Sequence, residues 1–198
     1  MKPKRILLLL SGGLDSVTLL HHFHGEGRSI HALLLRYGQN HADHELGWAK
    51  YHCRLLGVNF TTKDIGLLEG SKLTGGSGSW VVPARNLAFA SHAINYAVAN
   101  DVDSIVVGCN ATDEAGFPDC RESFFKTLNK LASIMELPVE VCAPFLHKQK
   151  WEIAAMARDI GVKLETIWTC YQPTEDGPCG KCGSCLKINQ AMEELCGR

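Results

Sequence analysis

Four cysteines near the C-terminal end of the chain have the spacing of a metal site. Cys170, Cys179, Cys182 and Cys185 follow one another as Cys-x8-Cys-x2-Cys-x2-Cys, in a segment rich in glycine, proline and lysine. Four thiolates held about 2.3 Å from one ion saturate a tetrahedral zinc. The sequence therefore predicts a structural zinc, because four protein ligands leave no coordination position open for catalysis. An iron–sulfur centre or redox-active thiols are alternatives for the same cysteines.

A second group of residues, near the N-terminus, has the composition of a phosphate-binding turn. The apolar run Ile6–Leu10 is followed by Ser-Gly-Gly-Leu-Asp-Ser at residues 11–16 and then by apolar residues at helical spacing. Gly12 and Gly13 permit a tight turn and a close approach of the backbone to phosphate. A helix that starts here would present its first N–H groups to the anion. Asp15 would cap that helix or help to hold magnesium. No Walker A motif occurs, and a plain strand-to-helix turn is the alternative.

Composition narrows the class of protein. The chain has 198 residues, of which 45% are hydrophobic and 21% charged, as is usual for one soluble globular domain with at most a small appendage. The longest apolar runs have the length of strands, so no membrane span is expected, and the short apolar run after the basic N-terminus does not fit a signal peptide. A net charge of −1 argues against a broad nucleic-acid surface. Nine cysteines without a secretion signal indicate a reducing, cytoplasmic location.

The elements that position these residues follow from hydrophobic periodicity. Short apolar or β-branched runs predict strands at 5–10, 30–36, 59–64, 104–109 and 139–143. Between them lie apolar helix faces, namely Leu46, Ala49, Cys53, Leu56; Leu87, Ala90, Ile94, Ala97; Phe124, Leu128, Leu131, Met135; and Ile153, Ala157, Ile160. Strands that alternate with helices predict a Rossmann-like α/β domain with a parallel five-stranded sheet over residues 1–165. A zinc-binding segment, residues 166–198 with a helix from 184 to 195, would pack on it. The Gly/Ser-rich stretch 66–79 is predicted to be a loop or lid.

The segment Ser11–Ser16 resembles the PP-loop of ATP pyrophosphatases, which cleave ATP between the α and β phosphates and adenylate an oxygen of a second substrate. Further stretches narrow the resemblance; they are Arg-Tyr-Gly-Gln at 36–39, Val-Pro-Ala-Arg-Asn at 82–86, Val-Gly-Cys-Asn at 107–110, Gly-Phe-Pro-Asp-Cys-Arg at 116–121 and Trp-Thr-Cys-Tyr at 168–171. Together with the cysteine spacing they resemble the 7-cyano-7-deazaguanine synthase family over nearly the whole chain.

The resemblance implies a reaction. ATP adenylates 7-carboxy-7-deazaguanine, and ammonia displaces AMP to give an amide. A second ATP activates the amide oxygen, and loss of AMP leaves a nitrile. Such a site must neutralise charge at the α-phosphate and exclude water from the acyl adenylate. The resemblance also implies magnesium with ATP, a structural zinc and a homodimer.

Site residues are carried over from the same motifs. ATP-binding residues would be Leu10, Ser11, Gly12, Gly13, Leu14, Asp15, Ser16, Tyr37 and Gly108. Substrate-binding residues would be Gln39, Arg85, Asn86, Asn110, Phe117, Asp119 and Arg121. Catalytic residues would be Asp15, Ser16, Arg85 and Lys150. Simpler alternatives are a surface ion pair for Arg85, a cap of the helix after Arg121 for Asp119, and a solvated first-turn lysine for Lys150. Cys120 is predicted to be a packing residue.

Two stretches depart from the family pattern. Residues 114–119 read Glu-Ala-Gly-Phe-Pro-Asp, where the family usually has Tyr-Ser-Gly-Tyr-Pro-Asp. Residues 147–150 read His-Lys-Gln-Lys, where the family tends to have Asp before a Ser/Thr-Lys pair. A reaction that stops at the amide, or that joins the deazaguanine to another amine such as a protein terminus, therefore stays open. A tRNA-modifying PP-loop enzyme is a further alternative, and a non-enzymatic zinc-ribbon module would leave the phosphate turn unexplained.

Overall fold

A central parallel sheet organises the chain. The computed structural model describes residues 5–66, 68–114 and 116–197. Its strands are β1 (Ile6–Leu9), β2 (Ile30–Arg36), β3 (Asn59–Asp64), β4 (Ser104–Val106) and β5 (Glu140–Cys142). They lie in the order β3-β2-β1-β4-β5, and every neighbouring pair is parallel. Leu8 of β1, for example, pairs with Ala32 on one side and Val106 on the other. The predicted five-stranded Rossmann-like sheet is confirmed.

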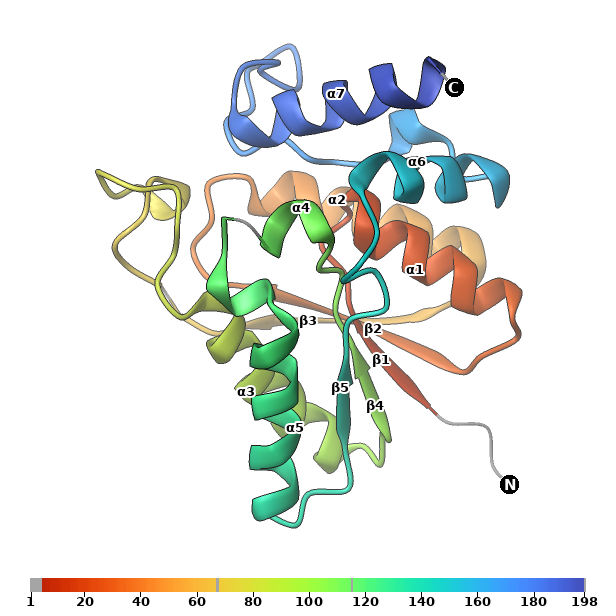
Figure 1. Cartoon of the computed structure of the whole chain (residues 1–198), viewed down its shortest axis with the longest axis vertical. Helices are drawn as coiled ribbons and strands as arrows, with labels where there is room; N and C mark the ends of the chain where they lie inside the picture. The colour runs from red at the N-terminus through yellow and green to blue at the C-terminus, as the bar shows by residue number, and fades with distance from the viewer. Residues whose placement is uncertain (1–4, 67, 115, 198) are drawn as a thin grey trace.

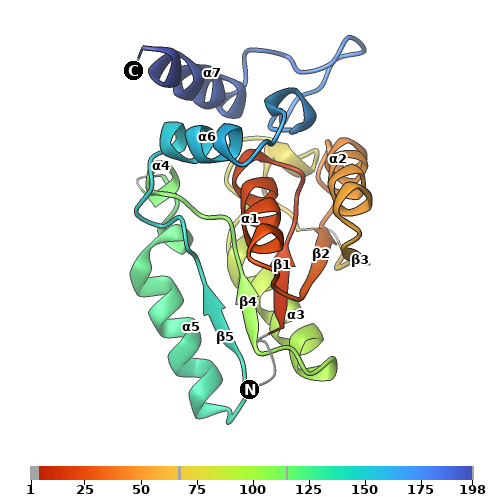
Figure 2. The same cartoon turned by 90° about the vertical axis from the view of Figure 1, so that its right-hand side faces the viewer.

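Helices cover both faces of this sheet. On one face lie α1 (Leu14–Gly25), α2 (Ala42–Leu56) and α6 (Lys150–Asp159), and on the other lie α3 (Arg85–Ala99) and α5 (Glu122–Ile134) (Figure 1). The C-terminal helix α7 (Gly183–Cys196) lies over α6, outside the α1/α2/α6 layer (Figure 2). Shorter elements are α4 (Ala111–Glu114) and the 3-10 turns η1 (Lys72–Thr74), η2 (Pro118–Cys120) and η3 (Leu164–Thr166).

The strand β1 is apolar at every position because both of its faces are covered. Ile6 and Leu8 contribute to the core under α1 and α6, whereas Leu7 contributes to the core under α3 and α5. Such continuous apolar runs are typical of buried parallel strands. The strand therefore leads straight from the middle of the core to the turn at residues 11–16.

The predicted apolar face of α5 is partly wrong. Phe125, Leu128 and Ala132 are buried, whereas Leu131 is 47% exposed and Met135 57% exposed. Apolar spacing gives the period of a stripe, but the packing of the helix on the sheet decides its phase. Leu87 in α3 and Ile160 after α6, also assigned to buried faces, are exposed for the same reason.

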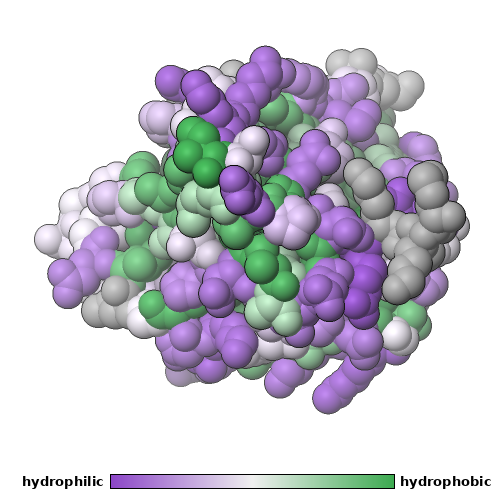
Figure 3. Space-filling model, turned by 90° about the horizontal axis from the view of Figure 1, so that it is seen from below, coloured by the Kyte–Doolittle hydropathy of each residue, from purple (hydrophilic) through white to green (hydrophobic). Residues whose placement is uncertain are grey.

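Viewed from below, the surface shows hydrophobic side chains gathered among hydrophilic ones (Figure 3). The homodimer stays a prediction.

The Gly/Ser-rich stretch packs against the domain in part. Leu73 in η1 is buried in a small apolar cluster with Tyr37 and Val82. The Ser71 hydroxyl accepts a hydrogen bond from the Leu73 N–H at 3.1 Å. Its action as a lid stays a prediction. Across the described residues, no helix has the length and hydropathy that a membrane crossing requires.

Candidate functional site

A cleft opens where the direction of the strand order reverses. From β1 the chain proceeds outward through β2 and β3, then crosses to β4 on the other side of β1. The loops after β1 and β4 therefore diverge, and in open α/β sheets ligands bind in the crevice between such loops. The cleft measures about 340 Å³. Residues that line it include Leu10, Ser11, Gly13, Leu14, Asp15, Ser16, Tyr37, Arg85, Asn86, Gly108, Phe117 and Lys150. Most of the sequence-predicted site is thus brought together.

The turn at residues 11–16 is closed by its two serines. The Ser16 hydroxyl accepts from the Ser11 N–H at 3.2 Å and donates to the Gly13 carbonyl, also at 3.2 Å. Gly12 has a positive φ of 78°, and a Cβ there would lie 2.9 Å from the Glu45 carbonyl oxygen, so only glycine fits. Helix α1 begins after Gly13 without a side-chain cap. The prediction that Asp15 caps α1 is therefore wrong, and the first-turn N–H groups face the cleft without a capping side chain.

Asp15 instead forms a buried polar cluster below the turn. Its Oδ2 accepts from the Asn110 side chain at 3.0 Å and from the Lys150 ammonium at 3.4 Å. Its Oδ1 is buried without a hydrogen-bond partner among the described residues. Burial raises the pKa of Asp15, and the positive charge of Lys150 offsets part of this rise. Lys150 is only 13% exposed, so the solvated alternative for it is wrong. Its position at the start of α6, which packs on α1, brings its ammonium to Asp15.

The loop after β4 approaches the phosphate turn closely. A Cβ at Gly108 would lie 3.1 Å from both the Asp15 Cβ and the Ser16 backbone nitrogen, so a larger residue would press on the phosphate turn where the two loops meet. Asn110 is fully buried, and its Oδ1 accepts from the backbone N–H groups of Thr112 and Asp113. Asn110 thus supports Asp15 and α4 and does not line the cleft.

Arg85 and Tyr37 form the wall opposite the phosphate turn. The Arg85 guanidinium donates to the Tyr37 hydroxyl at 3.4 Å and lies 5.8 Å from the ring centre of Phe89. Burial raises the pKa of Tyr37 to about 12, although the Arg85 charge opposes this rise. Among the described residues, Arg85 forms no ion pair of the kind proposed as its simpler role. Arg85 instead presents a cation to the cleft, suited to a carboxylate or phosphate.

Besides Asn110, three more residues assigned to substrate binding lie outside the main cleft. The Asp119 carboxylate accepts from the Asn86 backbone N–H at 3.2 Å, and Asp119 lines an adjoining cavity of about 30 Å³. It therefore caps α3, not the helix after Arg121 as the simpler alternative had it. Arg121 is exposed. Gln39 is buried, where its side chain accepts from the Tyr37 N–H and donates to Glu45. Cys120 is buried in the core under α3 and α5, as predicted, and reaches the cleft wall.

Several cleft residues were absent from the sequence-based set. His41 and Glu45 follow the Tyr37–Gln39 stretch and line the cleft, as does Tyr171. Asp113 and Lys187 form an ion pair of 3.4 Å at the cleft, between α4 and α7. The spacing of His41 and Glu45 by one helical turn, beside a motif already identified, was a usable signal. No sequence signal indicated the pairing of Asp113 with Lys187, because the two residues lie far apart in the sequence.

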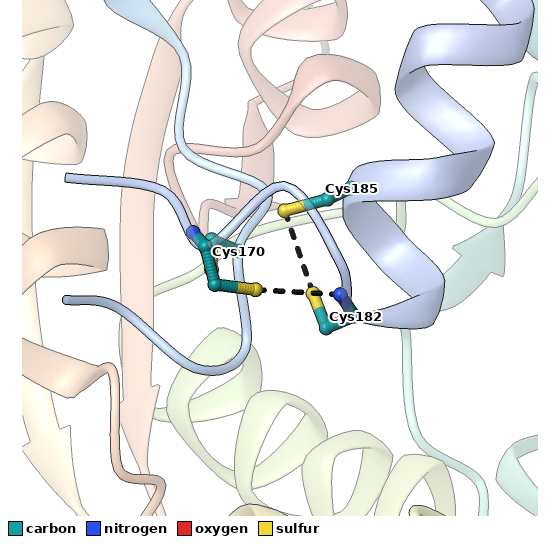
Figure 4. Close-up of side chains that lie close together, drawn as sticks. Cys170, Cys182 and Cys185 are labelled. Carbon is teal, nitrogen blue, oxygen red and sulfur yellow. Dashed lines mark hydrogen bonds between the residues drawn. The ribbon is translucent and has the colours of Figure 1, made fainter.

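The four cysteines come together as predicted. The sulfurs of Cys170, Cys179, Cys182 and Cys185 all lie within 4.8 Å of one another. Three of these side chains point toward a common centre, with the sulfurs of Cys182 and Cys185 3.5 Å apart (Figure 4). Backbone N–H groups of Lys181 and Cys182 donate to the Cys179 sulfur and lower the pKa of that thiol to about 6. Such N–H donors stabilise thiolates, and the donor set fits a metal ion.

This cysteine segment is tied directly to the phosphate turn. The Trp168 N–H donates to the Gly12 carbonyl at 2.8 Å, and the Trp168 indole donates to the Cys170 carbonyl at 2.9 Å. The Trp168 carbonyl oxygen also lies 3.3 Å from the position that a Cβ on Gly13 would occupy. Trp168 thus joins the turn at residues 11–16 to Cys170, the first of the four cysteines.

Solved structures place the fold in a class. The chain resembles the U34-tRNA thiolase NcsA from Methanococcus maripaludis, a structure that contains a 4Fe–4S cluster, with a TM-score of 0.60 and 15% identity over 100% of this chain and 67% of that one. It also resembles the NH3-dependent NAD synthetase from Campylobacter jejuni, with a TM-score of 0.53 and 18% identity over 84% of this chain and 68% of that one. The chain therefore has the α/β fold of these proteins, with a glycine-rich turn after β1.

The family follows from sequence comparison. The family model for Queuosine biosynthesis protein QueC matches residues 5–196. A 7-cyano-7-deazaguanine synthase from Hahella chejuensis is 36% identical over 97% of this chain and 90% of its own length. One from a Marinomonas species is 35% identical over 96% of this chain and 94% of its own. The chain belongs to the QueC family, and the resemblance stated from its motifs is confirmed.

Proposed function

We propose that this protein converts 7-carboxy-7-deazaguanine, ATP and ammonia into 7-cyano-7-deazaguanine through adenylated acid and amide intermediates. The observation that carries the proposal is a cleft with an anion-binding helix start on one wall and the Arg85 cation on the other, in a chain of the QueC family. A carboxylate is a poor electrophile, and adenylation supplies a leaving group. Cations and N–H donors on both sides of the α-phosphate stabilise the charge that develops as pyrophosphate departs.

Magnesium would enter with ATP at Asp15. The buried Oδ1 of Asp15 has no hydrogen-bond partner among the described residues. Carboxylate oxygens beside phosphates are the ligands that Mg²⁺ prefers. The Lys150 ammonium, 3.4 Å from Oδ2, would contact a phosphate oxygen. Ser16 would hold the turn in shape through its bonds to Ser11 and Gly13.

The deazaguanine end would lie toward Arg85, Asn86 and Phe117. Phe117 lacks the hydroxyl that the family pattern has at this position. The Lys187 ammonium lies 5.7 Å from the centre of the Phe117 ring, where it can form a cation–π contact. Ala115, a second departure in the same stretch, lies outside the described residues. The amide as final product, or a conjugate with another amine, is therefore the second candidate. Asp119, Arg121, Gln39 and Asn110 would act by holding the walls of the cleft.

Zinc is the metal that the cysteines fit best. Four thiolates about 2.3 Å from one ion have their sulfurs roughly 3.8 Å apart by tetrahedral geometry, which agrees with four sulfurs within 4.8 Å of one another. In a 4Fe–4S cluster each thiolate binds a different iron, so the sulfurs must spread around a larger body. The zinc would be structural, because all four of its positions are taken by the chain.

The deciding experiment incubates the purified protein with Mg-ATP, ammonium and 7-carboxy-7-deazaguanine and follows AMP and the base by mass spectrometry. We expect the nitrile, with two AMP released per nitrile. An amide that persists would select the second candidate. AMP release without either product, or no AMP release, would overturn the proposal and direct the search to other amines and to tRNA.

A further inference from the structure

His41 is a buried histidine with one ring nitrogen unused. Its side chain is 2% exposed and lines the cleft. Its Nε2 lies 3.5 Å from the Glu45 carboxylate, and its Nδ1 is buried without a hydrogen-bond partner among the described residues. An unpaired buried polar atom costs free energy, so a structural role alone does not account for this side chain. Nδ1 is enclosed by protein in this structure, so a ligand N–H would satisfy it only after a shift of the side chains around it.

Glu45 is held so that one of its oxygens is left for His41. The Tyr37 backbone N–H donates to the Gln39 Oε1 at 2.9 Å, which fixes the orientation of the Gln39 amide. The amide nitrogen then donates to the Glu45 Oε2 at 2.9 Å. The remaining Oε1 faces the Nε2 of His41. A carboxylate close to one imidazole nitrogen favours the tautomer with the proton on that nitrogen, which leaves the other nitrogen with its lone pair.

We propose that His41 is the general base that removes a proton from the incoming amine, with Glu45 as the residue that positions it. This inference rests on the proposed function. Ammonia, like other amines, is protonated to ammonium at neutral pH, and ammonium has no free lone pair. Nδ1 takes one proton from ammonium, and the ammonia lone pair forms the C–N bond at the acyl-adenylate carbon. The C–O bond to AMP then breaks, its electron pair leaves with AMP, and the attacking nitrogen loses its surplus proton to solvent.

Two side chains enclose the His41 ring. The Glu45 carboxylate lies one helical turn along α2, 3.5 Å from Nε2. The ring of Tyr171, from the cysteine segment, packs on His41 with centres 5.2 Å apart.

The test separates adenylation from amine attack. In His41→Gln the amide nitrogen can still donate to Glu45, but no base remains. ATP–pyrophosphate exchange with 7-carboxy-7-deazaguanine, measured without an amine, reports adenylation alone. We expect exchange within about twofold of wild type, and ammonium-dependent amide formation reduced about 10²-fold, the usual effect of losing a general base. Hydroxylamine, which is neutral at pH 7, needs no base, so hydroxamate formation should be kept.

Each other outcome has a distinct meaning. Unchanged use of ammonium by His41→Gln, or an equal loss with hydroxylamine, would overturn the role of His41 as a base. Absence of exchange in the wild-type protein would instead overturn the proposed function, and the inference with it. If His41→Gln loses exchange by misfolding, Glu45→Gln decides, since it should depress the ammonium reaction alone and shift its pH profile. His92→Gln, on the exposed side of α3, is the matched control and should leave every rate unchanged.

Discussion

At the scale of single residues, the burial of Asp15 costs stability, because only one of its carboxylate oxygens has a hydrogen-bond partner among the described residues. Its Oδ1 lacks a hydrogen-bond partner among the described residues, while Oδ2 is shared by Asn110 and Lys150. Burial raises its pKa, which Lys150 only partly offsets. Folding therefore disfavours the ionised form. A cation or a phosphate-bound metal would repay this cost only when the nucleotide is present.

The raised pKa of Asp15 makes the stability of the protein depend on pH. For a carboxyl with a raised pKa, the stabilising contribution is present below the unfolded pKa, about 4, and is lost as pH rises through the higher folded value. Asp15→Asn lacks this titration. Without nucleotide or magnesium, we expect the melting temperature of Asp15→Asn relative to wild type to increase as pH rises from about 4 to 7. Thermal melts across that range measure it, and a difference that stays flat or decreases would contradict the assignment.

At the scale of elements, Asp119 shows how one side chain joins two of them. It lies in η2, and its carboxylate accepts from the N–H of Asn86 in the first turn of α3. The Asn86 side chain returns a hydrogen bond to the Asp119 carbonyl at 3.2 Å. This pair fixes the start of α3, and with it the backbone of Arg85.

Removal of this cap should therefore weaken α3. We expect Asp119→Ala to lower the free energy of unfolding by about 1 kcal/mol, the usual value of an N-cap. Asp119→Asn keeps an acceptor oxygen and should lose only a few tenths of a kcal/mol. Urea unfolding of both variants provides the comparison. Equal losses in the two variants would mean that the charge of Asp119, and not its acceptor oxygen, stabilises the protein.

The sequence predicted elements better than contacts between them. Strands at 30–36 and 59–64 were predicted at the bounds that β2 and β3 have. The strand predicted to reach residue 109 ends at Val106, because the chain turns so that Gly108 meets the phosphate turn. The ion pair of Asp15 with Lys150 joins residues 135 positions apart, and no local pattern encodes it. Cysteine spacing and the turn at 11–16, in contrast, are local and were predicted correctly.

At the scale of the whole molecule, the cysteine segment is part of the site. Tyr171, Gly183 and Lys187 line the cleft, and Trp168 is hydrogen-bonded to Gly12 of the phosphate turn. Helix α7 packs on α6, which carries Lys150. The division into a domain at 1–165 and a segment at 166–198 stays a prediction, but the two parts contribute walls to the same cleft. Loss of the metal should therefore also disturb the cleft where we propose that ATP binds.

Removal of the metal should make the C-terminal segment unfold before the rest of the chain. Binding of structural zinc contributes about 10–16 kcal/mol in small domains, whereas the cores around β1 are built largely from residues before the cysteines. We expect the protein as purified to contain one zinc per chain. Chelation should leave most of the helical circular dichroism in place, produce an early melting transition for the C-terminal segment, and weaken ATP binding at least tenfold, because Trp168 no longer fixes Gly12.

Cys182→Ser should reproduce these effects, and Cys196→Ser, at an exposed cysteine outside the cluster, should not. Chelation that removes the metal but leaves both the melting curve and ATP affinity unchanged would show that the segment holds the phosphate turn without its metal.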